Sequence, residues 1–280
     1  MLKITSLNLN GIRAAYRKGM QYWLTQENPD IVLMQEVRAN DKVIEELINS
    51  NWNVVACHCD IKGRAGVAIM SRFPLENVVS SLEEEQPVDT GRWIEANVQT
   101  PKGKSLRLAC AYLHAGEINT VKMQQKYAHL DKVTKRLQQL YDYNKKTGNP
   151  VLVCGDFNIV RSEQDIKNWK PNHNKSAGVM DEEIAYLNKW FDSGWTDITR
   201  SFYPNLQGPY TWWSWRGNAY NNDAGWRIDY QIGLGEIVSC VQDVTVYKPG
   251  EYIERFSDHA PLTITYDLSL IHISEPTRPY

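Results

Sequence analysis

Residues that could bind a metal ion or move a proton stand where apolar, strand-like runs of the sequence end. The set contains carboxylates, carboxamides and one histidine: Asn8, Glu36, Asp156, Asn158, Asp229, Asp258 and His259. Carboxylate and carboxamide oxygens are ligands for hard cations such as Mg²⁺, and an Asp beside a His can orient the imidazole and favour its protonated form. Such a set could neutralise a phosphate, activate a water and stabilise a leaving oxygen, which phosphodiester hydrolysis requires. No Cys/His cluster in the sequence points to zinc.

Each of these residues also has an ordinary structural explanation. Asn, Asp and Gly form turns and cap helices, so Gly155-Asp156-Phe157-Asn158 alone is more often a turn, and Ser257-Asp258-His259 alone could be a cap. The same residue types recur at the ends of several strands, however, and an α/β scaffold builds its site at strand ends. The joint pattern therefore favours one shared site.

Many short β-type runs and fewer helical runs must position these residues. Strands are predicted at 3–9, 30–35, 52–57, 66–71, 93–98, 106–112, 151–154, 211–215, 228–233, 238–247 and 262–266. Helices are predicted around 20–24 and 43–48, from 120 to about 143 with Gly148 as the stop, and at 181–192 with an acidic first turn. Without a repeat or a composition break, this order predicts two packed sheets covered by helices in one domain.

Composition excludes several classes of protein. The 280 residues are 42% hydrophobic and include 10 Trp and 15 Tyr, which excludes a disordered chain, and the apolar runs are too short to span a membrane. The 31 basic and 33 acidic residues nearly cancel, so a nucleic acid would have to meet a local basic face. The number of cysteines, five, is odd; we expect Cys57, Cys59, Cys110 and Cys154 to be buried free thiols and Cys57-His58-Cys59 to bind no metal. The first residues show no signal pattern, so we expect a cytoplasmic protein.

Nine segments, in order from residue 1 to about 267, resemble the exonuclease III family of abasic-site endonucleases in the endonuclease/exonuclease/phosphatase superfamily. They are NLNGIRA at 8–14, MQEV at 34–37, GRAGVAI at 63–69, GR at 91–92, AY at 111–112, GDFNI at 155–159, YTWW at 210–213, GWRIDY at 225–230 and SDHAP at 257–261. Each segment alone is weakly specific, whereas nine in order are very specific. The resemblance implies a four-layer α/β sandwich like that of deoxyribonuclease I, with two mixed sheets flanked by helices, over residues 1–268.

The same resemblance implies a metal-dependent DNA repair nuclease, an exodeoxyribonuclease III or AP endonuclease. It would hydrolyse the phosphodiester 5′ to abasic sites, with 3′→5′ exonuclease and 3′-end-cleaning phosphodiesterase activity. The implied cofactor is Mg²⁺, which Mn²⁺ can replace, and the implied partner is double-stranded DNA with abasic sites or 3′ ends. We expect a monomer that does not bind membranes.

The resemblance also assigns roles to individual residues. The implied metal ligands are Asn8, Glu36, Asp156, Asn158, Asp258 and His259, and the implied catalytic residues are Tyr112, Asp156, Asn158, Asp229 and His259. Asp229 would be the partner of His259, and either Asp156 or His259 could be the general base. Tyr112 would bond the phosphate or the leaving group, although without the resemblance a core aromatic is the simpler interpretation.

Contacts to DNA are implied for Arg13, Lys175, Ser176, Trp212, Arg216, Trp226 and Ile228. Lys175 lies in a basic loop that suits a DNA backbone, although a solvated loop explains it as well. Trp212, Trp226 and Ile228 correspond to a pocket for a flipped-out abasic sugar, and Arg216 to a wedge in the helix. Where relatives carry an aromatic or aliphatic residue and then Pro after the tyrosine, this chain has Leu113-His114-Ala115, so no DNA contact is predicted for Ile118.

Other functions remain open at this stage. The protein could be mainly a 3′→5′ double-strand exodeoxyribonuclease with little abasic incision, or a non-catalytic DNA-binding module on the same fold. Phosphoinositide phosphatases and sphingomyelinases share the metal core, but the Trp-rich segment favours DNA, and a secreted deoxyribonuclease is disfavoured by the lack of a signal and of evident disulfides. We expect residues 269–280, with two prolines and no periodicity, to be a non-native or disordered tail.

Overall fold

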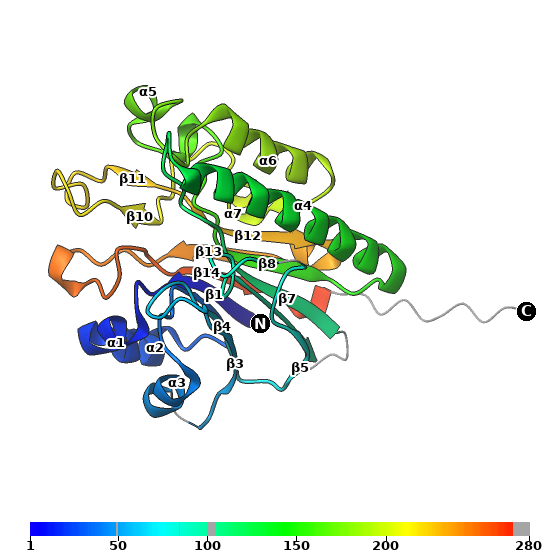
Figure 1. Ribbon diagram of the computed structural model, residues 1–280. Helices are drawn as coiled ribbons and strands as arrows, with labels where there is room; N and C mark the ends of the chain where they lie inside the picture. The colour runs from blue at the N-terminus through cyan, green and yellow to red at the C-terminus, as the bar shows by residue number, and fades with distance from the viewer. Residues whose placement is uncertain (49, 84, 100–104, 271–280) are drawn as a thin grey trace, which may run out of the picture.

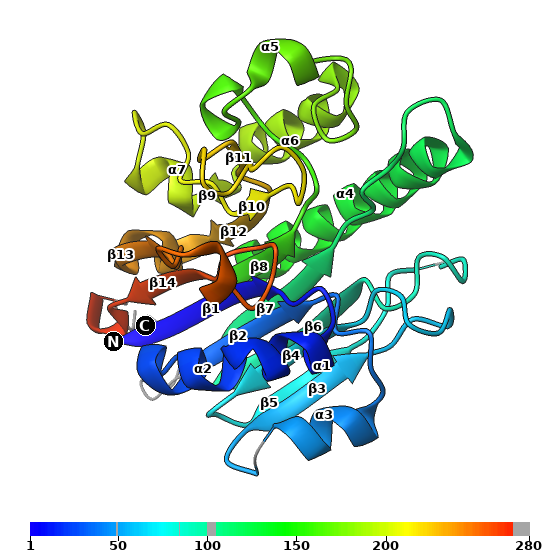
Figure 2. The same cartoon turned by 90° about the vertical axis from the view of Figure 1, so that its left-hand side faces the viewer.

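Two six-stranded mixed sheets lie face to face, with helices on both outer faces (Figure 1). The computed structural model describes residues 1–48, 50–83, 85–99 and 105–270. Helices α4 and α6 cover one sheet and α1 to α3 cover the other, while β10 and β11 project to one side, which faces the viewer in Figure 2. This arrangement confirms the predicted four-layer α/β sandwich.

The first sheet has the order β13-β14-β1-β2-β4-β3 and the second the order β5-β6-β7-β8-β12-β9. The strands of the first are β1 (Leu2–Asn8), β2 (Ile31–Gln35), β3 (Asn53–Cys57), β4 (Val67–Ser71), β13 (Val241–Val246) and β14 (Leu262–Tyr266). Those of the second are β5 (Leu75–Val79), β6 (Trp93–Gln99), β7 (Ser105–Tyr112), β8 (Val151–Asp156), β9 (Thr196–Asp197) and β12 (Asp229–Leu234). A separate ribbon pairs β10 (Trp212–Trp213) with β11 (Gly225–Trp226). Only β1–β2 and β7–β8 are parallel pairs among the described strands. In each of these pairs, the carboxyl ends of the two strands therefore lie side by side.

The helices are α1 (Ile12–Ala15), α2 (Gln21–Glu27), α3 (Asp41–Leu47), α4 (Val121–Thr147), α5 (Trp169–Asn172), α6 (Asp181–Asp192) and α7 (Ile198–Phe202). Helix α4 begins after Thr120, whose hydroxyl accepts a hydrogen bond from the Lys122 N–H, and ends at Gly148, which adopts the left-handed conformation that suits glycine. Helix α6 has the predicted bounds, and its acidic first turn lies at the positive end of the helix.

Three apolar layers hold the sandwich together. The layer between the sheets contains alternate residues of each strand, for example Ile31 and Leu33 of β2, while Val32 and Met34 pack under α1 to α3. A third layer joins the second sheet to α4 and α6. Because both faces of each central strand are buried, the strands are apolar throughout, which made them easy to predict.

The structure corrects several predictions. Residues 238–240 belong to a 3₁₀ turn, Gly235–Cys240, before β13, and the 211–215 strand shortens to β10. The mostly exposed edge strand β5 and the two-residue β9 were not predicted, because neither carries a run of apolar residues. No disulfide joins the cysteines, all of which are described, but Cys57 and Cys59 are only half-buried.

Two further predictions concern the ends of the molecule and membranes. Residues 269 and 270 of the predicted tail lie in the 3₁₀ turn Leu268–Leu270, and 271–280 lie outside the described residues. Among the described residues, no helix is both long and apolar enough to cross a bilayer.

Candidate active site

The predicted site residues of both sheets meet at one edge of the sandwich. Asn8 ends β1 and Asp156 ends β8, and the amide nitrogen Nδ2 of Asn8 donates to Asp156 Oδ2 at 2.9 Å and to Glu36 Oε1 at 3.0 Å. Glu36 directly follows β2, which runs parallel to β1 and therefore ends beside it. One carboxamide thus connects carboxylates of the two sheets.

A glycine allows Asp156 to approach its neighbours. Gly155 has φ +155°, and a Cβ at this position would lie 1.8 Å from the carbonyl oxygen of Ala111 on β7. Only glycine fits so close a backbone approach. As a result, Tyr112 and Asp156 are direct partners in the parallel register of β7 and β8.

His259 lies between two aspartates. Its Nδ1 is 2.8 Å from Asp229 Oδ2, and its Nε2 is 3.8 Å from Asp156 Oδ2. Ser257 fixes the segment, since its hydroxyl donates to the Asn8 carbonyl at 2.7 Å and accepts from the His259 N–H at 3.2 Å. The final strand, β14, begins only after this turn.

The charges of the aspartates set the protonation of this group. Burial alone would lower the pKa of His259, but Asp229 and Asp156 raise it to about 10, so the imidazole is protonated at neutral pH. Burial raises the pKa of Asp156 to about 8, with Asp229 and Glu36 adding to the effect and His259 opposing it. The cluster therefore holds a cation and a carboxyl group that titrates close to neutral pH.

Tyr112 and Asn158 are two further residues next to Asp156, one in register with it on β7 and the other two residues after it. Burial, and then the charges of Glu36 and Asp156, raise the pKa of Tyr112 well above its usual value, so its hydroxyl is a neutral donor. Asn158 donates from Nδ2 to Asp156 Oδ2 at 3.1 Å and to the Leu113 carbonyl at 3.0 Å. Asn158 is thus held against the carboxyl group of Asp156, while the Tyr112 hydroxyl is hydrogen-bonded to Glu36.

Asp258 turns to a different set of partners. Its Oδ1 accepts from Asn10 Nδ2 at 2.9 Å and its Oδ2 from Trp212 Nε1 at 3.1 Å. Burial would raise the pKa of Asp258, but His259 and these two hydrogen bonds lower it overall. Asp258 is therefore ionised and available as an oxygen ligand.

The donor set fits a hard divalent cation. Asp156, Asp229 and His259 offer ligand atoms within 4.8 Å of one another, and the buried Asp229 Oδ1 has no hydrogen-bond partner among the described residues. A buried carboxylate oxygen without a partner is costly unless a cation or water meets it. Glu36, with φ +51°, is held in the left-handed conformation and pairs with Arg38 through Oε2. Asn8 turns its amide nitrogen, not its oxygen, to the carboxylates.

The residues implied to contact an abasic sugar lie together. The rings of Trp212 and Trp226 meet edge to face, with centroids 5.5 Å apart, and pack in one apolar cluster with Ile228. Both tryptophans are half-buried, whereas Ile228 is buried. Trp212 also forms a β-bridge with His259, so this apolar cluster lies next to the group formed by His259, Asp229 and Asp156.

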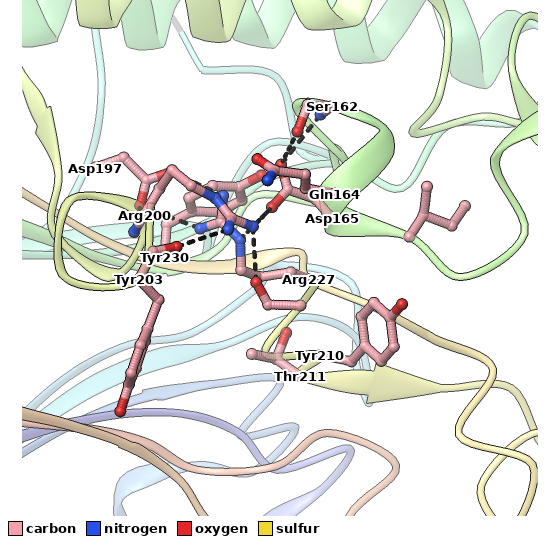
Figure 3. Close-up of polar contacts among 12 residues, drawn as sticks. Ser162, Gln164, Asp165, Asp197, Arg200, Tyr203, Tyr210, Thr211, Arg227 and Tyr230 are labelled. Carbon is pink, nitrogen blue, oxygen red and sulfur yellow. Dashed lines mark hydrogen bonds and ion pairs between the residues drawn. The ribbon is translucent and has the colours of Figure 1, made fainter. Parts of the chain in front are cut away.

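A buried ion network anchors the same segment (Figure 3). The fully buried Arg227 donates from Nε to Asp165 Oδ1 at 2.7 Å and from Nη2 to Asp197 Oδ2 at 2.8 Å, and Arg200 donates to the same Asp165 oxygen at 2.5 Å. Arg227 lies between Trp226 and Ile228 in the sequence and two residues before Asp229. The network therefore fixes the backbone that carries the two pocket residues and the partner of His259.

The remaining predicted DNA contacts lie on the surface. Arg13 and Lys175 are exposed, and Arg216 is exposed on a turn after Trp215. Ser176 is half-buried, and its hydroxyl donates to Asn172 Oδ1 at 2.8 Å. The structure does not gather these four residues into one contact cluster.

Sequence reasoning missed a basic groove and a buried lysine. Arg13 lines the groove with Arg38, Lys62 and Arg64, and through Arg38 the groove begins at Glu36. The fully buried Lys126 donates to the Asn158 carbonyl at 2.8 Å and pairs with Glu183 at 2.5 Å. Lys62 directly precedes the GRAGVAI segment and Arg64 is its second residue, so this segment was the available sequence signal.

Residues 5–259 match the sequence profile of the Endonuclease/Exonuclease/phosphatase family. The chain belongs to this family. The exodeoxyribonuclease of Bacillus subtilis (strain 168) is 28% identical over 276 residues, which cover 95% of this chain and 100% of that protein. This agrees with the resemblance drawn from the nine sequence segments.

Solved structures of the family share the fold. An AP endonuclease from Archaeoglobus fulgidus superposes with a TM-score of 0.78 at 28% identity, covering 96% of this chain and 100% of the other. The 3′ phosphatase NExo from Neisseria, bound to a product DNA hairpin, gives 0.81 at 25% identity, covering 95% and 100%. The family fold thus spans nearly the whole of this chain.

Proposed function

We propose that this member of the Endonuclease/Exonuclease/phosphatase family is a DNA repair nuclease that hydrolyses the phosphodiester 5′ to an abasic site in double-stranded DNA. The observation that carries the proposal is the position of His259 between Asp229 and Asp156, in one cluster with Asn158 and Glu36. The likeness to an exodeoxyribonuclease and an AP endonuclease supports DNA as the substrate. The catalytic unit would be residues 1–268, acting as a cytoplasmic monomer.

Glu36, Asp156 and Asp258 would hold Mg²⁺, or Mn²⁺ in its place, with Asn8 and Asn158 as further ligands through their carboxamide oxygens. The ion would supply charge neutralisation at the phosphate. Asn8 would have to turn its side chain to become a ligand, because its nitrogen now binds Glu36 and Asp156. The hard oxygen donors favour Mg²⁺ over softer cations at this edge of the sandwich.

The protonation states favour distinct roles for His259 and Asp156. A protonated imidazole has no free lone pair, so His259 acts as a cationic clamp on a phosphate oxygen rather than as the metal ligand or the base that the sequence left open. Asp156, whose Oδ2 lies 3.8 Å from His259 Nε2, would accept a proton from the attacking water when its carboxyl is ionised. Asn158 and the neutral Tyr112 would donate hydrogen bonds to the phosphate or the leaving oxygen.

Recognition of the damaged strand would use shape and backbone contacts. The Trp212–Trp226 pair with Ile228 would form the wall of a pocket for a sugar without a base, and flipping costs least where stacking is already lost. The groove lined by Arg13, together with Lys175 and Ser176, would bind phosphates, and Arg216 would enter the helix as a wedge.

A labelled duplex tests this function. One strand carries a single internal abasic analogue, and matched duplexes carry either no lesion or a recessed 3′ end. With Mg²⁺ we expect one fragment that ends 5′ to the lesion, and little loss of the undamaged strand. Binding without cleavage on every duplex would identify a DNA-binding module instead.

A second candidate is a 3′→5′ exonuclease with little abasic incision. The likeness to an exodeoxyribonuclease and to a 3′ phosphatase favours it. In the same experiment it would shorten recessed 3′ ends faster than it nicks the internal lesion. That outcome would replace the first proposal.

A further inference from the structure

Two histidines and an aspartate from three separate segments meet inside the protein, in a group distinct from that of His259. Asp89 lies in the loop before β6, His114 follows β7 and His129 lies on α4, and all three side chains are buried. Each offers a ligand atom, and these atoms lie within 4.8 Å of one another. The mechanism proposed above uses none of them.

His129 is the member whose environment is unexplained. Its side chain is fully buried, yet neither ring nitrogen has a hydrogen-bond partner among the described residues. Its Nδ1 lies 3.9 Å from Asp89 Oδ1, and the same oxygen is 2.8 Å from His114 Nε2. Because a buried imidazole without partners is costly, the arrangement indicates that another group occupies this place.

Both imidazoles are in the form that binds metals. Burial lowers the pKa of His114 to about 4 and that of His129 to about 3, so both rings are neutral at neutral pH. A neutral ring keeps a lone pair for a cation, and binding then releases no proton from the imidazoles. Protonation therefore does not compete with a metal here under ordinary conditions.

We propose that Asp89, His114 and His129 form a second metal site, for a borderline transition cation and best for Zn²⁺. Two imidazole nitrogens and one carboxylate oxygen are a zinc donor set, whereas the oxygen-rich set around Glu36 suits Mg²⁺. Ligand atoms of a tetrahedral zinc at about 2.1 Å stand about 3.4 Å apart. The observed separations of 2.8 and 3.9 Å bracket that spacing, so small shifts complete the site, with a water as the fourth ligand.

Lys132 limits how tightly the site binds. Its Nζ lies 3.3 Å from Asp89 Oδ2, while the distances of 2.8 and 3.9 Å from the two histidines are to Asp89 Oδ1. A like charge this close weakens the binding of a cation. Replacing Lys132 by an uncharged residue should therefore strengthen metal binding. This variant tests the proposal by a gain of metal affinity rather than a loss.

The bound ion would have a structural role. It would tie α4 to the segment that directly follows Tyr112, and the next carbonyl, that of Leu113, accepts the hydrogen bond from Asn158 Nδ2. The bound ion would thus help to fix the segment that holds Asn158 beside Asp156. The proposal does not depend on which phosphodiester the enzyme cleaves.

Metal content tests the proposal directly. The full chain is freed of metal with a chelator, saturated with Mg²⁺, exposed to Zn²⁺ and dialysed against Mg²⁺, and the retained zinc is measured. We expect about one equivalent of zinc and a higher melting temperature, because an ion that binds only the folded state stabilises it. Co²⁺ in place of Zn²⁺ should give the strong visible bands of a four-coordinate site.

Variants assign the ion to these residues. His129→Leu and Asp89→Asn should weaken Zn²⁺ binding at least about 100-fold, and Lys132→Met should tighten it. His58→Asn is the matched control, because His58 forms a similar hydrogen bond with Asp41 at 2.7 Å but is half-exposed and belongs to no group of three ligands among the described residues. His259→Asn controls for zinc at the other cluster. Both controls should retain the ion.

Specific results would overturn the proposal. They are a wild-type protein that retains no zinc, zinc that survives in folded His129→Leu, or zinc that is lost in His259→Asn. If His129→Leu and Asp89→Asn do not fold, Lys132→Met decides the matter, and unchanged zinc affinity in that variant contradicts the site.

Discussion

Asp156 and Asp229 lie directly opposite each other in the antiparallel pairing of β8 and β12, and His259 contacts both carboxylates. Two buried negative charges on neighbouring strands would repel each other without a cation between them. The imidazolium of His259 is that cation, which is why its pKa is raised to about 10 despite its burial. The three residues therefore form one electrostatic unit.

This unit predicts non-additive losses. Asp229→Asn and His259→Asn should each lower kcat by about 10²–10⁴-fold, and the double variant should lose little more, because each change alone disables the shared clamp. Single-turnover incision of an abasic duplex measures the rates, with melting temperatures as the control for folding. Losses that multiply in the double variant would show that the residues act independently.

The pKa of His259 also predicts how stability depends on pH. Because the pKa of His259 is higher in the folded state, its protonation contributes to stability. This contribution is complete below the unfolded pKa of about 6.5 and is lost as the pH rises through about 10. Between about pH 8 and pH 10, where the carboxyl of Asp156 is ionised, metal-free protein should therefore lose stability as pH rises.

Urea unfolding at several pH values checks that expectation. The slope of the free energy of unfolding against pH should be smaller in His259→Asn than in the wild type, because other titrating groups are common to both. Equal slopes would contradict a protonated His259.

The Arg227 network predicts a large effect on stability. Arg227→Met leaves Asp165 and Asp197 buried with one partner fewer, which should cost about 3–5 kcal/mol of unfolding free energy. Arg72→Met, which removes an exposed arginine stacked on Trp52, is the control and should cost about 1 kcal/mol or less. Denaturant unfolding distinguishes the two, and similar losses would show that the network contributes little.

The Trp212–Trp226 pair predicts the selectivity of cleavage. Trp226→Ala should slow abasic incision while raising relative activity on intact or bulky-lesion duplexes, because the wall that excludes a base is gone. Arg216→Ala should weaken binding of damaged duplex with a smaller effect on kcat. Trp52→Ala controls for loss of an aromatic ring, because Trp52 precedes β3 and packs in a different apolar cluster. An unchanged preference in Trp226→Ala would mean that the pair is not the selector.

Much of this architecture could be predicted because the signals were local. The central strands are apolar along their whole length, and parallel pairing places the end of β1, with Asn8, beside the end of β2, and the end of β8, with Asp156, beside the end of β7. The meeting of Asn8 with Asp156 depends on how the two sheets pack. The acidic first turn of α6 and the glycine after α4 likewise marked helix ends.

What could not be predicted depends on contacts between distant segments. No spacing rule joins Arg227 to Asp165 and Asp197, and nothing in the sequence brings His114 and His129 together, so the search for paired Cys and His residues found no zinc site. The left-handed conformation of Glu36 was equally invisible, because it is imposed by neighbouring backbone rather than by its own residue type.

The central claim is that a metal held at Glu36 and its neighbours drives phosphodiester hydrolysis. The most direct measurement is the single-turnover rate of abasic-duplex incision across a Mg²⁺ titration, for the wild type and for Glu36→Gln. We expect no cleavage in chelator, a saturable rise with Mg²⁺ in the wild type, and in Glu36→Gln a rate lower by about 10²-fold or more that needs more Mg²⁺, with an unchanged melting temperature. Cleavage that persists in chelator, or a Glu36→Gln rate equal to that of the wild type at every Mg²⁺ concentration, would contradict the claim.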